Sequence, residues 1–180
     1  MIGKKMLEAV NKQIVAETYS AWLYLQMAAY FEESNLKGFS NWLKVQAEEE
    51  LTHATLFFNH LADRGGKIRL GAIEAPASEW KSPQAVFEAA YAHEQKVTGM
   101  INSLVELSIA EKDYASNPQL QWFVKEQIEE EKNTGEMAAK LKLVGSTGEG
   151  VLRLDAEAAT RTFVYPPPVL AGGEAAAPTA

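Results

Sequence analysis

The sequence predicts an all-α protein: a four-helix bundle with one long crossover between its second and third helices, followed by a short fifth helix. Three observations support this prediction. The seven prolines leave residues 1–75, 84–117 and 119–165 uninterrupted, and proline is the residue that a helix interior tolerates least. Within these stretches, apolar residues recur at steps of three and four, which is typical of a bundle seam. Two of the connections are short and one is long, which limits the topology.

The first two helices are expected at about residues 4–34 and 38–64, where a turn at Leu36 separates them and the pair Gly65 and Gly66 follows the second. Both windows show the same alternation of three-residue and four-residue steps. The two seams, in chain order, are Leu7, Val10, Ile14, Glu17, Ala21, Tyr24, Ala28 and Phe31, then Phe39, Leu43, Gln46, Glu50, His53 and Phe57.

The third and fourth helices are expected at about residues 83–111 and 117–144. Only Gly99 and Gly135 lie inside these windows, and each costs about 1 kcal/mol of helix stability relative to alanine. The two seams, in chain order, are Phe87, Ala90, Glu94, Val97, Ile101 and Leu104, then Leu120, Phe123, Gln127, Glu130, Thr134, Met137, Leu141 and Val144.

The remaining residues predict one further helix and a tail. We expect residues 1–145 to form the bundle and residues 146–164 to form a short fifth helix, near 148–160, with a packing segment. Apolar residues such as Leu154 give this helix a side that can pack. Residues 165–180 are rich in proline, glycine and alanine, which is the composition of a disordered end.

The connections predict how the helices are arranged. Residues 35–37 and 112–117 are short links, which force the helices that they join to lie antiparallel. The second and third helices are joined by Gly66–Ser82, which spans roughly 55 Å when extended at about 3.3 Å per residue. A helix of about 28 residues is only about 42 Å long. The segment can therefore cross the whole bundle and start the third helix at the far end.

Composition excludes several classes of protein. The chain has 180 residues, a formal net charge of −7 and no cysteine, so it has neither disulfides nor thiolate metal sites and lacks the basic balance of nucleic-acid binders. The longest charge-free apolar stretch is residues 18–31. A helix that spans a bilayer needs about 20 apolar residues, so this stretch is too short. Glu8 lies where a signal peptide would need an uninterrupted apolar run, so no signal peptide is expected. We expect a cytoplasmic protein without a membrane partner.

Each predicted seam is interrupted by polar residues near its middle. Counted from the turns, these positions lie within one or two helical turns of a common height at about 1.5 Å per residue. The interrupting residues are Glu17, then Glu50 and His53, then Glu94, then Gln127 and Glu130. Six polar side chains are therefore expected to meet in one layer inside the core.

Four buried carboxylates need positive charge, because each buried ion loses several kcal/mol of hydration and the seams contain no lysine or arginine. Two divalent cations would balance them, and carboxylate oxygens with one imidazole suit Fe(II) or Mn(II). Glu50 and His53, three residues apart, share one helix face. One seam glutamate alone would ordinarily be solvated, and His53 alone would be a core histidine. The same interruption on four helices predicts a two-metal centre.

The residues around these positions carry a more specific pattern. It consists of Glu17, Glu49–His53, Glu94 and Trp122–Glu131, together with Leu36–Trp42 and Ser78–Trp80. With these motifs the chain resembles the prokaryotic non-haem ferritins over about residues 3–165. The resemblance implies a ferritin-like bundle and an iron-storage protein with ferroxidase activity, in which dioxygen or peroxide oxidises Fe(II) to Fe(III). It also implies a homo-oligomeric hollow shell of 24 subunits that holds the ferric mineral.

The resemblance further implies a role for each site residue. One iron would be held by Glu17, Glu50 and His53, and a second by Glu94 and Glu130, with Glu50 bridging and Gln127 close by. A third iron site would use Glu49, Glu126, Glu129 and Glu130. The alternative interpretation of Glu49 and Glu129 is that they are ordinary solvated glutamates. Tyr24 matches a family tyrosine beside the di-iron centre, either as a redox or hydrogen-bonding residue or as an aromatic core residue.

Two positions distinguish the chain from other di-iron proteins. Di-iron oxygenases, rubrerythrins and bacterioferritins carry a second Glu-x-x-His motif on the fourth helix, where this chain has Gln127–Glu130. Bacterioferritins have a haem-binding methionine after the first motif's glutamate, where this chain has Leu51, so no haem is expected. The alternatives are a di-iron oxygenase or peroxidase acting on another substrate, which would need a substrate pocket, and a scaffold or encapsulating protein with a vestigial site.

Overall fold

The predicted four-helix bundle with a short fifth helix is confirmed. The computed structural model describes residues 2–145 and 147–165, and the helices of these residues end within two residues of the predicted windows. They are α1 (Lys4–Glu33), α2 (Lys37–Asp63), α3 (Pro83–Ala110), the 3-10 turn η1 (Tyr114–Ser116), α4 (Asn117–Val144) and α5 (Gly148–Ala158). The disordered tail expected at 165–180 lies, from residue 166 onward, outside the described residues.

Residues with a left-handed backbone end each of the four long helices. Asn35 follows α1 with φ 56°, Gly65 follows α2 with φ 65°, Lys112 follows α3 with φ 55° and Gly145 follows α4 with φ 58°. After the first three, the next amide donates a hydrogen bond to a carbonyl of the last helical turn, at 2.8–3.0 Å. These bonds satisfy carbonyls that the helix itself leaves unpaired, so the turns lie where glycine, asparagine or a short polar link occurs in the sequence.

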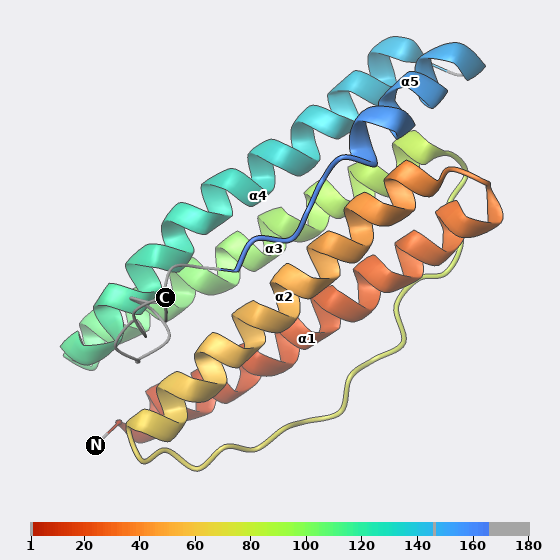
Figure 1. Cartoon of the computed structure of the whole chain (residues 1–180). Coiled ribbons are helices and arrows are strands. Elements are labelled where there is room, and N and C mark those ends of the chain that lie inside the picture. The colour runs from red at the N-terminus through yellow and green to blue at the C-terminus, as the bar shows by residue number, and fades with distance from the viewer. Residues whose placement is uncertain (1, 146, 166–180) are drawn as a thin grey trace, which may run out of the picture.

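The helices pair as α1 with α2 and α3 with α4, and a long crossover joins the two pairs (Figure 1). The crossover, residues 64–82, runs along the outside of the bundle from the end of α2 to the opposite end, where α3 begins. Asn11 on α1 holds it in place, because its side chain accepts the Arg69 amide at 2.6 Å and donates to the Lys67 carbonyl at 3.2 Å. Helices α2 and α3 therefore run parallel.

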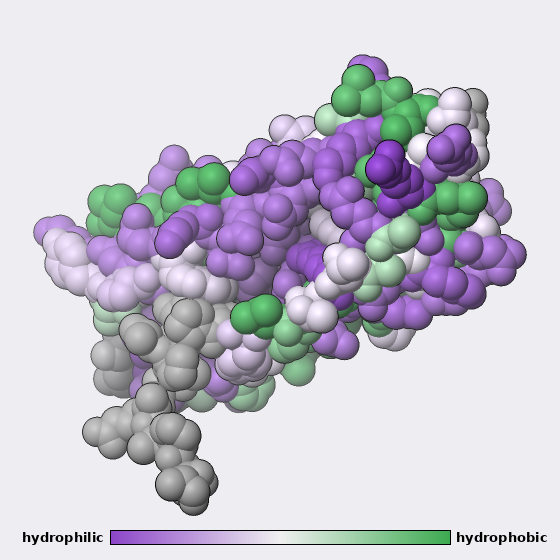
Figure 2. Space-filling model, turned by 45° about the horizontal axis from the view of Figure 1, so that its top comes forward, coloured by the Kyte–Doolittle hydropathy of each residue, from purple (hydrophilic) through white to green (hydrophobic). Residues whose placement is uncertain are grey.

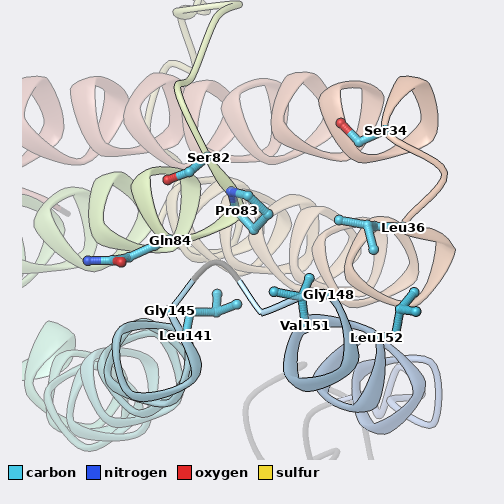
Figure 3. A pocket seen from close by; sticks show the side chains of 10 residues that line it. All are labelled: Ser34, Leu36, Ser82, Pro83, Gln84, Leu141, Gly145, Gly148, Val151 and Leu152. Atoms are coloured by element: carbon cyan, nitrogen blue, oxygen red, sulfur yellow. The ribbon is translucent and has the colours of Figure 1, made fainter.

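Helix α5 closes one end of the bundle by a close approach to the start of α2. A Cβ atom at Gly38 would lie 1.7 Å from the Asp155 carbonyl oxygen, so this contact requires glycine. The Asp155 carboxylate accepts the Phe39 amide at 2.8 Å and thereby caps the first turn of α2. Beside this contact lies a pocket of about 550 Å³, whose lining side chains, drawn in Figure 3, include no titratable group.

The core consists of two hydrophobic clusters with polar residues between them. The cluster at the α5 end is built around Phe31, Phe39 and Phe87. The cluster at the other end includes Phe57 and Phe123, whose rings stack at 4.2 Å between centroids. Burial of these large apolar side chains supplies the main stabilisation of the bundle. It holds the four helices at fixed spacing on both sides of the polar middle.

The outer surface is mixed in character. On the face drawn in Figure 2, hydrophilic side chains predominate, and hydrophobic side chains form separate groups, several of them at the end that carries α5. Within the described residues, none of the helices combines the length and the apolar character that crossing a bilayer requires.

Candidate metal centre

The structure brings the predicted seam residues of all four long helices together. We refer to Glu17 of α1, Glu50 and His53 of α2, Glu94 of α3 and Glu130 of α4 as the carboxylate layer. Each of the five side chains belongs to a residue that is at most 3% exposed. Their helical spacing places them on the inward stripe that also carries the core residues, so the packing that buries the hydrophobic clusters buries the layer as well.

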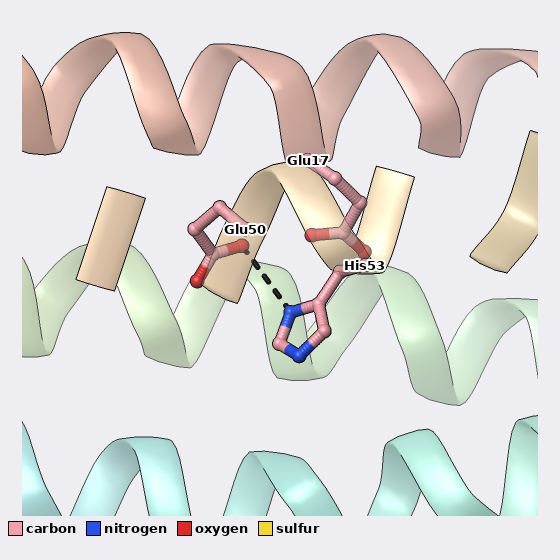
Figure 4. Close-up of side chains that lie close together, drawn as sticks. All are labelled: Glu17, Glu50 and His53. Atoms are coloured by element: carbon pink, nitrogen blue, oxygen red, sulfur yellow. Dashed lines mark ion pairs between the residues drawn. The ribbon is translucent and has the colours of Figure 1, made fainter. Parts of the chain in front are cut away.

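The ligand atoms of the layer are close enough to share metal ions. Three sets of side chains each offer one nitrogen or oxygen atom per residue, all within 4.8 Å of one another. The sets are Glu17, Glu50 and His53; Glu50, Glu94 and Glu130; and His53, Glu126 and Glu130. Figure 4 shows the first set, with Glu17 reaching from α1 toward the pair on α2. Because Glu50 belongs to two sets, its carboxylate can bridge neighbouring ions.

Two oxygens of the layer have no hydrogen-bond partner among residues 2–145 and 147–165. They are Glu17 Oε2 and Glu94 Oε2, both buried. The other oxygen of each carboxylate is bonded, since Glu17 Oε1 accepts from the Gln13 amide at 2.9 Å and Glu94 Oε1 accepts from the Tyr24 hydroxyl. Buried carboxylate oxygens are almost always paired in proteins. Unpaired ones, each on a residue that belongs to a set with ligand atoms within 4.8 Å of one another, are suited to a metal ion.

No lysine or arginine of the described residues forms an ion pair with the layer, and the one contact of this kind joins His53 Nδ1 to Glu50 Oε2 at 3.5 Å. Burial, reinforced by the charge of Glu50, raises the pKa of Glu17 to about 8. Burial and the charge of Glu94 raise the pKa of Glu130 to about 8. Burial also holds the pKa values of Glu50 and Glu94 well above their ordinary range. The layer therefore takes up protons or cations to become neutral.

The imidazole of His53 is fixed by aromatic neighbours on α4. Its ring lies edge-on to Trp122 at 5.6 Å and to Phe123 at 5.4 Å between centroids. Gln127, one of the predicted residues, is buried in the same region, and its side-chain oxygen accepts from the Thr98 hydroxyl at 3.0 Å. Because Gln127 also lies three residues before Glu130 on α4, about one helical turn away, it is adjacent to the layer.

The four residues predicted for a third site lie in different surroundings. Glu126 and Glu130 come together with His53, whereas Glu129 is exposed. Glu49 forms an ion pair with Arg161, from the segment after α5. The third metal site therefore stays a prediction, and His53 is the additional residue that the geometry brings to it.

Two glutamines contribute to the layer although the sequence analysis did not assign them to the site. Gln13 donates to Glu17 at 2.9 Å, and Gln46 donates to Glu50 at 3.3 Å and to Glu130 at 2.6 Å. Each glutamine lies four residues before a layer glutamate on the same helix. The repeated Gln-x-x-x-Glu spacing on the first two helices is a sequence signal that could have found both.

Comparison with known proteins agrees with this geometry. The family model described as ferritin-like domain matches residues 7–144. The bacterial non-heme ferritin of Bacteroides fragilis (strain YCH46) is 38% identical over 148 residues, which cover 82% of this chain and 93% of that protein. The probable bacterial non-heme ferritin-like protein of Haemophilus influenzae is 39% identical over 155 residues, covering 86% and 94%.

Solved structures extend the agreement to the whole fold. The open pore ferritin of the archaeon Archaeoglobus fulgidus is 50% identical, with a TM-score of 0.89, and the match covers 90% of this chain and all of that one. A family model over most of the chain, these relatives and the five-helix architecture lead to one conclusion: the chain belongs to the ferritin family, among the non-haem ferritins.

Proposed function

We propose that this chain is the subunit of an iron-storage protein with ferroxidase activity. Fe(II) is the substrate, dioxygen or peroxide is the oxidant, and the ferric product is deposited inside a hollow homo-oligomeric shell of 24 subunits. The observation that carries the proposal is the pair of buried, unpaired carboxylate oxygens of Glu17 and Glu94. They lie in a layer whose carboxylates have no lysine or arginine partner within the described residues.

The layer binds two ferrous ions in this proposal. Glu17 and His53 hold one ion, Glu94 and Glu130 hold the other, and Glu50 bridges them. Four carboxylates carry four negative charges and two Fe(II) ions carry four positive charges, so the loaded layer is neutral. Carboxylate oxygens with one imidazole are a ligand set that suits Fe(II).

Oxidation then disturbs this balance. Each substrate ion loses one electron to the oxidant, which leaves two excess positive charges in the layer. Water that gives up protons restores neutrality, and the protons leave to solvent. Because Gln127 stands where the second Glu-x-x-His motif of related proteins has its glutamate, one anionic ligand is missing, so the ferric ions are held weakly and pass on toward the mineral. Stable retention of two Fe(III) ions per subunit after turnover would contradict this release.

Two further roles belong to the same proposal. Tyr24, whose hydroxyl donates to Glu94, is the candidate catalytic residue that takes part in oxidation beside the second ion. A third iron ion binds next to the layer through Glu126 and Glu130, with Glu49 and Glu129 as the other ligands expected from the family resemblance.

An oxygenase or peroxidase acting on an organic substrate is the alternative enzyme. The pocket in Figure 3 lies at the α5 end, away from the layer. A pocket of about 350 Å³ does lie beside Gln127, between α3 and α4, and Thr98 and Glu131 line it. The oligomeric state distinguishes the two functions, because mineral storage requires a hollow shell of subunits and an oxygenase does not.

The test is addition of Fe(II) under air, followed by the ferric absorbance. We expect rapid oxidation by the unchanged protein and strongly reduced oxidation by Glu50→Ala and His53→Ala. Glu48→Ala is the matched control, because Glu48 is exposed two residues from Glu50. On gel filtration we expect a particle of about 24 times the 19.8 kDa subunit mass. Elution as a monomer or dimer, or full activity of Glu50→Ala, would overturn the proposal.

A further inference from the structure

The segment that follows α5 returns along the bundle between α2 and α4 (Figure 1) and carries Arg161. Asn41 on α2 donates to the Arg161 backbone carbonyl at 2.9 Å. The guanidinium carbon lies 4.1 Å from the ring centroid of Trp42, which is also on α2, in a cation–π contact. Both the backbone and the head group of Arg161 are therefore held against α2.

The Arg161 guanidinium has two polar partners beside the carboxylate layer. Nη1 donates to Gln46 Oε1 at 2.7 Å, and Nη2 pairs with the Glu49 carboxylate. The side chains of Arg161 and Glu49 are only 17% and 21% exposed. A planar guanidinium that donates to two neighbours at once is a rigid fork, and a charge-assisted pair of this kind is stronger in partial burial than at an open surface.

Arg161 also determines how Gln46 faces the layer. Arginine can only donate hydrogen bonds, so Gln46 must turn its carbonyl oxygen outward to Arg161 and its amide nitrogen inward. That nitrogen lies 2.6 Å from Glu130 Oε2 and 3.3 Å from Glu50 Oε1. One arginine thus reaches three carboxylates, directly at Glu49 and through Gln46 at Glu50 and Glu130.

Glu49 and Glu130 are two of the four residues expected to bind a third ion. With Arg161 in place, Glu49 already has a positive partner and Glu130 already has a hydrogen-bond donor. A divalent cation that takes Glu49 as a ligand must displace the guanidinium, or else bind next to its positive charge. Both cost free energy, because like charges repel strongly in a partly buried site.

We propose that Arg161 is a positioning residue that competes with the third cation, so that two ions bind tightly in the carboxylate layer and a third binds only when the guanidinium leaves Glu49. This inference rests on the proposed two-metal function. It goes beyond it by assigning the limit on metal occupancy to a residue that is neither a metal ligand nor part of the bundle.

The experiment counts redox-inert Zn²⁺ ions bound to the full-length, assembled protein, by calorimetry and by anomalous scattering from crystals. The unchanged protein should bind two Zn²⁺ per subunit tightly and a third more weakly. Arg161→Gln should bind the third ion at least about tenfold more tightly, the size expected from losing one charge-assisted contact. The anomalous map of this variant should place the additional ion at Glu49.

Three further variants separate charge competition from structural damage. Arg153→Gln removes the same charge from an exposed position on α5 and should bind Zn²⁺ like the unchanged protein. Arg161→Lys keeps the positive charge beside Glu49, so its affinity for the third Zn²⁺ ion should stay near that of the unchanged protein. Adding Glu49→Gln to Arg161→Gln should abolish the gain.

The two proposals fail in different ways. Fewer than two tight Zn²⁺ ions in the unchanged protein would overturn the two-metal function. If the unchanged protein binds two Zn²⁺ ions tightly but Arg161→Gln binds the third Zn²⁺ ion no more tightly than the unchanged protein does, only the role of Arg161 is overturned. Equal gains in Arg161→Lys and Arg161→Gln would also overturn it, because a loosened segment rather than lost charge would then explain the effect.

Discussion

The carboxylate layer contains buried charge, the end of the bundle where α2 ends contains partly buried charge, and the two regions balance it differently. At the bundle end, Arg64 donates two hydrogen bonds to the Asp113 carboxylate, at 2.7 and 2.5 Å. Ser116 donates to the same carboxylate at 2.8 Å, and His60 lies 2.9 Å from the Ser116 hydroxyl. We call these four residues the end cluster. It contains its own cation, whereas the layer has four carboxylates and one imidazole.

The pKa values shift in opposite directions in the two regions. Hydrogen bonds from Arg64 lower the pKa of Asp113 below its ordinary value. Burial raises the pKa values of Glu17 and Glu130 to about 8. The Asp113 carboxylate, which is partly buried and has a fixed partner, is a structural element that ties the end of α2 to the link between α3 and α4. A buried carboxylate without a fixed partner is a binding element that depends on an ion from outside.

The largest expected effect is stabilisation of the layer by metal. Zn²⁺ should raise the free energy of unfolding by about 4 kcal/mol per tightly bound ion at a free concentration about 1,000 times Kd. The measurement is thermal unfolding at fixed protein concentration, with Zn²⁺ or with a chelator. Without metal, Glu50→Gln should be more stable than the unchanged protein, because the cost of protonating or burying this carboxylate is gone, and the Zn²⁺ effect should largely vanish. Equal Zn²⁺ effects in both proteins would contradict the bridging role of Glu50.

The second largest expected effect is the pH dependence of the folding stability of the metal-free protein, measured in the presence of a chelator. Glu17 and Glu130 have folded pKa values of about 8 and ordinary values when unfolded, so between about pH 4.5 and 8 the folded state binds more protons. Stability is then greatest below this window and falls as pH rises through it, by up to about 1.4 kcal/mol per pH unit for each carboxyl. Urea unfolding at several pH values measures the slope.

Glu17→Gln provides the control for this slope. Removing one titrating carboxyl should make the decline shallower in the chelated protein. In Zn²⁺ the sign should reverse, because the ion competes with protons for the same oxygens and binds better as pH rises. A chelated protein whose stability rises from pH 5 to 8 would show that the layer carboxylates are not protonated in the folded state.

Breaking the end cluster should cost about 2 kcal/mol of folding free energy. Arg64→Gln removes the charged partner of the partly buried Asp113 carboxylate, and hydrogen bonds to charged groups typically contribute about 1.5–3 kcal/mol. Arg69→Gln, at an exposed position of the crossover, is the matched control and should change stability little. Chemical unfolding measures both. Fe(II) oxidation per folded subunit should be unchanged in Arg64→Gln, and its loss would contradict the separation of the two regions.

The smallest expected effect concerns Tyr24. Tyr24→Phe removes the hydroxyl that donates to Glu94 and leaves that carboxylate less well oriented. Affinity for the second ion should fall about tenfold, as is typical when the hydrogen-bond partner of a metal ligand is removed. Zn²⁺ titration measures the affinity. A loss of oxidation rate much larger than the loss of affinity would favour a redox role, and no change in either would make Tyr24 a core residue only.

Local sequence patterns predicted most of the bundle. The three-four spacing of Leu7, Val10 and Ile14 and the proline-free windows depend on neighbouring residues along one helix, which is why they are readable from the sequence. The polar interruptions at Glu17, Glu50 and Glu94 were readable for the same reason. Comparing the distances of these residues from the turns was enough to predict that they meet.

The tertiary structure decided which partners those residues have. Asp155 caps α2 at Gly38 and Phe39, more than one hundred residues away in sequence, and no local pattern predicts such a contact. The same holds for Arg161, which lies beside Glu49 only because α5 docks and the chain turns back. Helical periodicity fixes the face on which a side chain lies, whereas the partner across that face depends on how the whole chain packs.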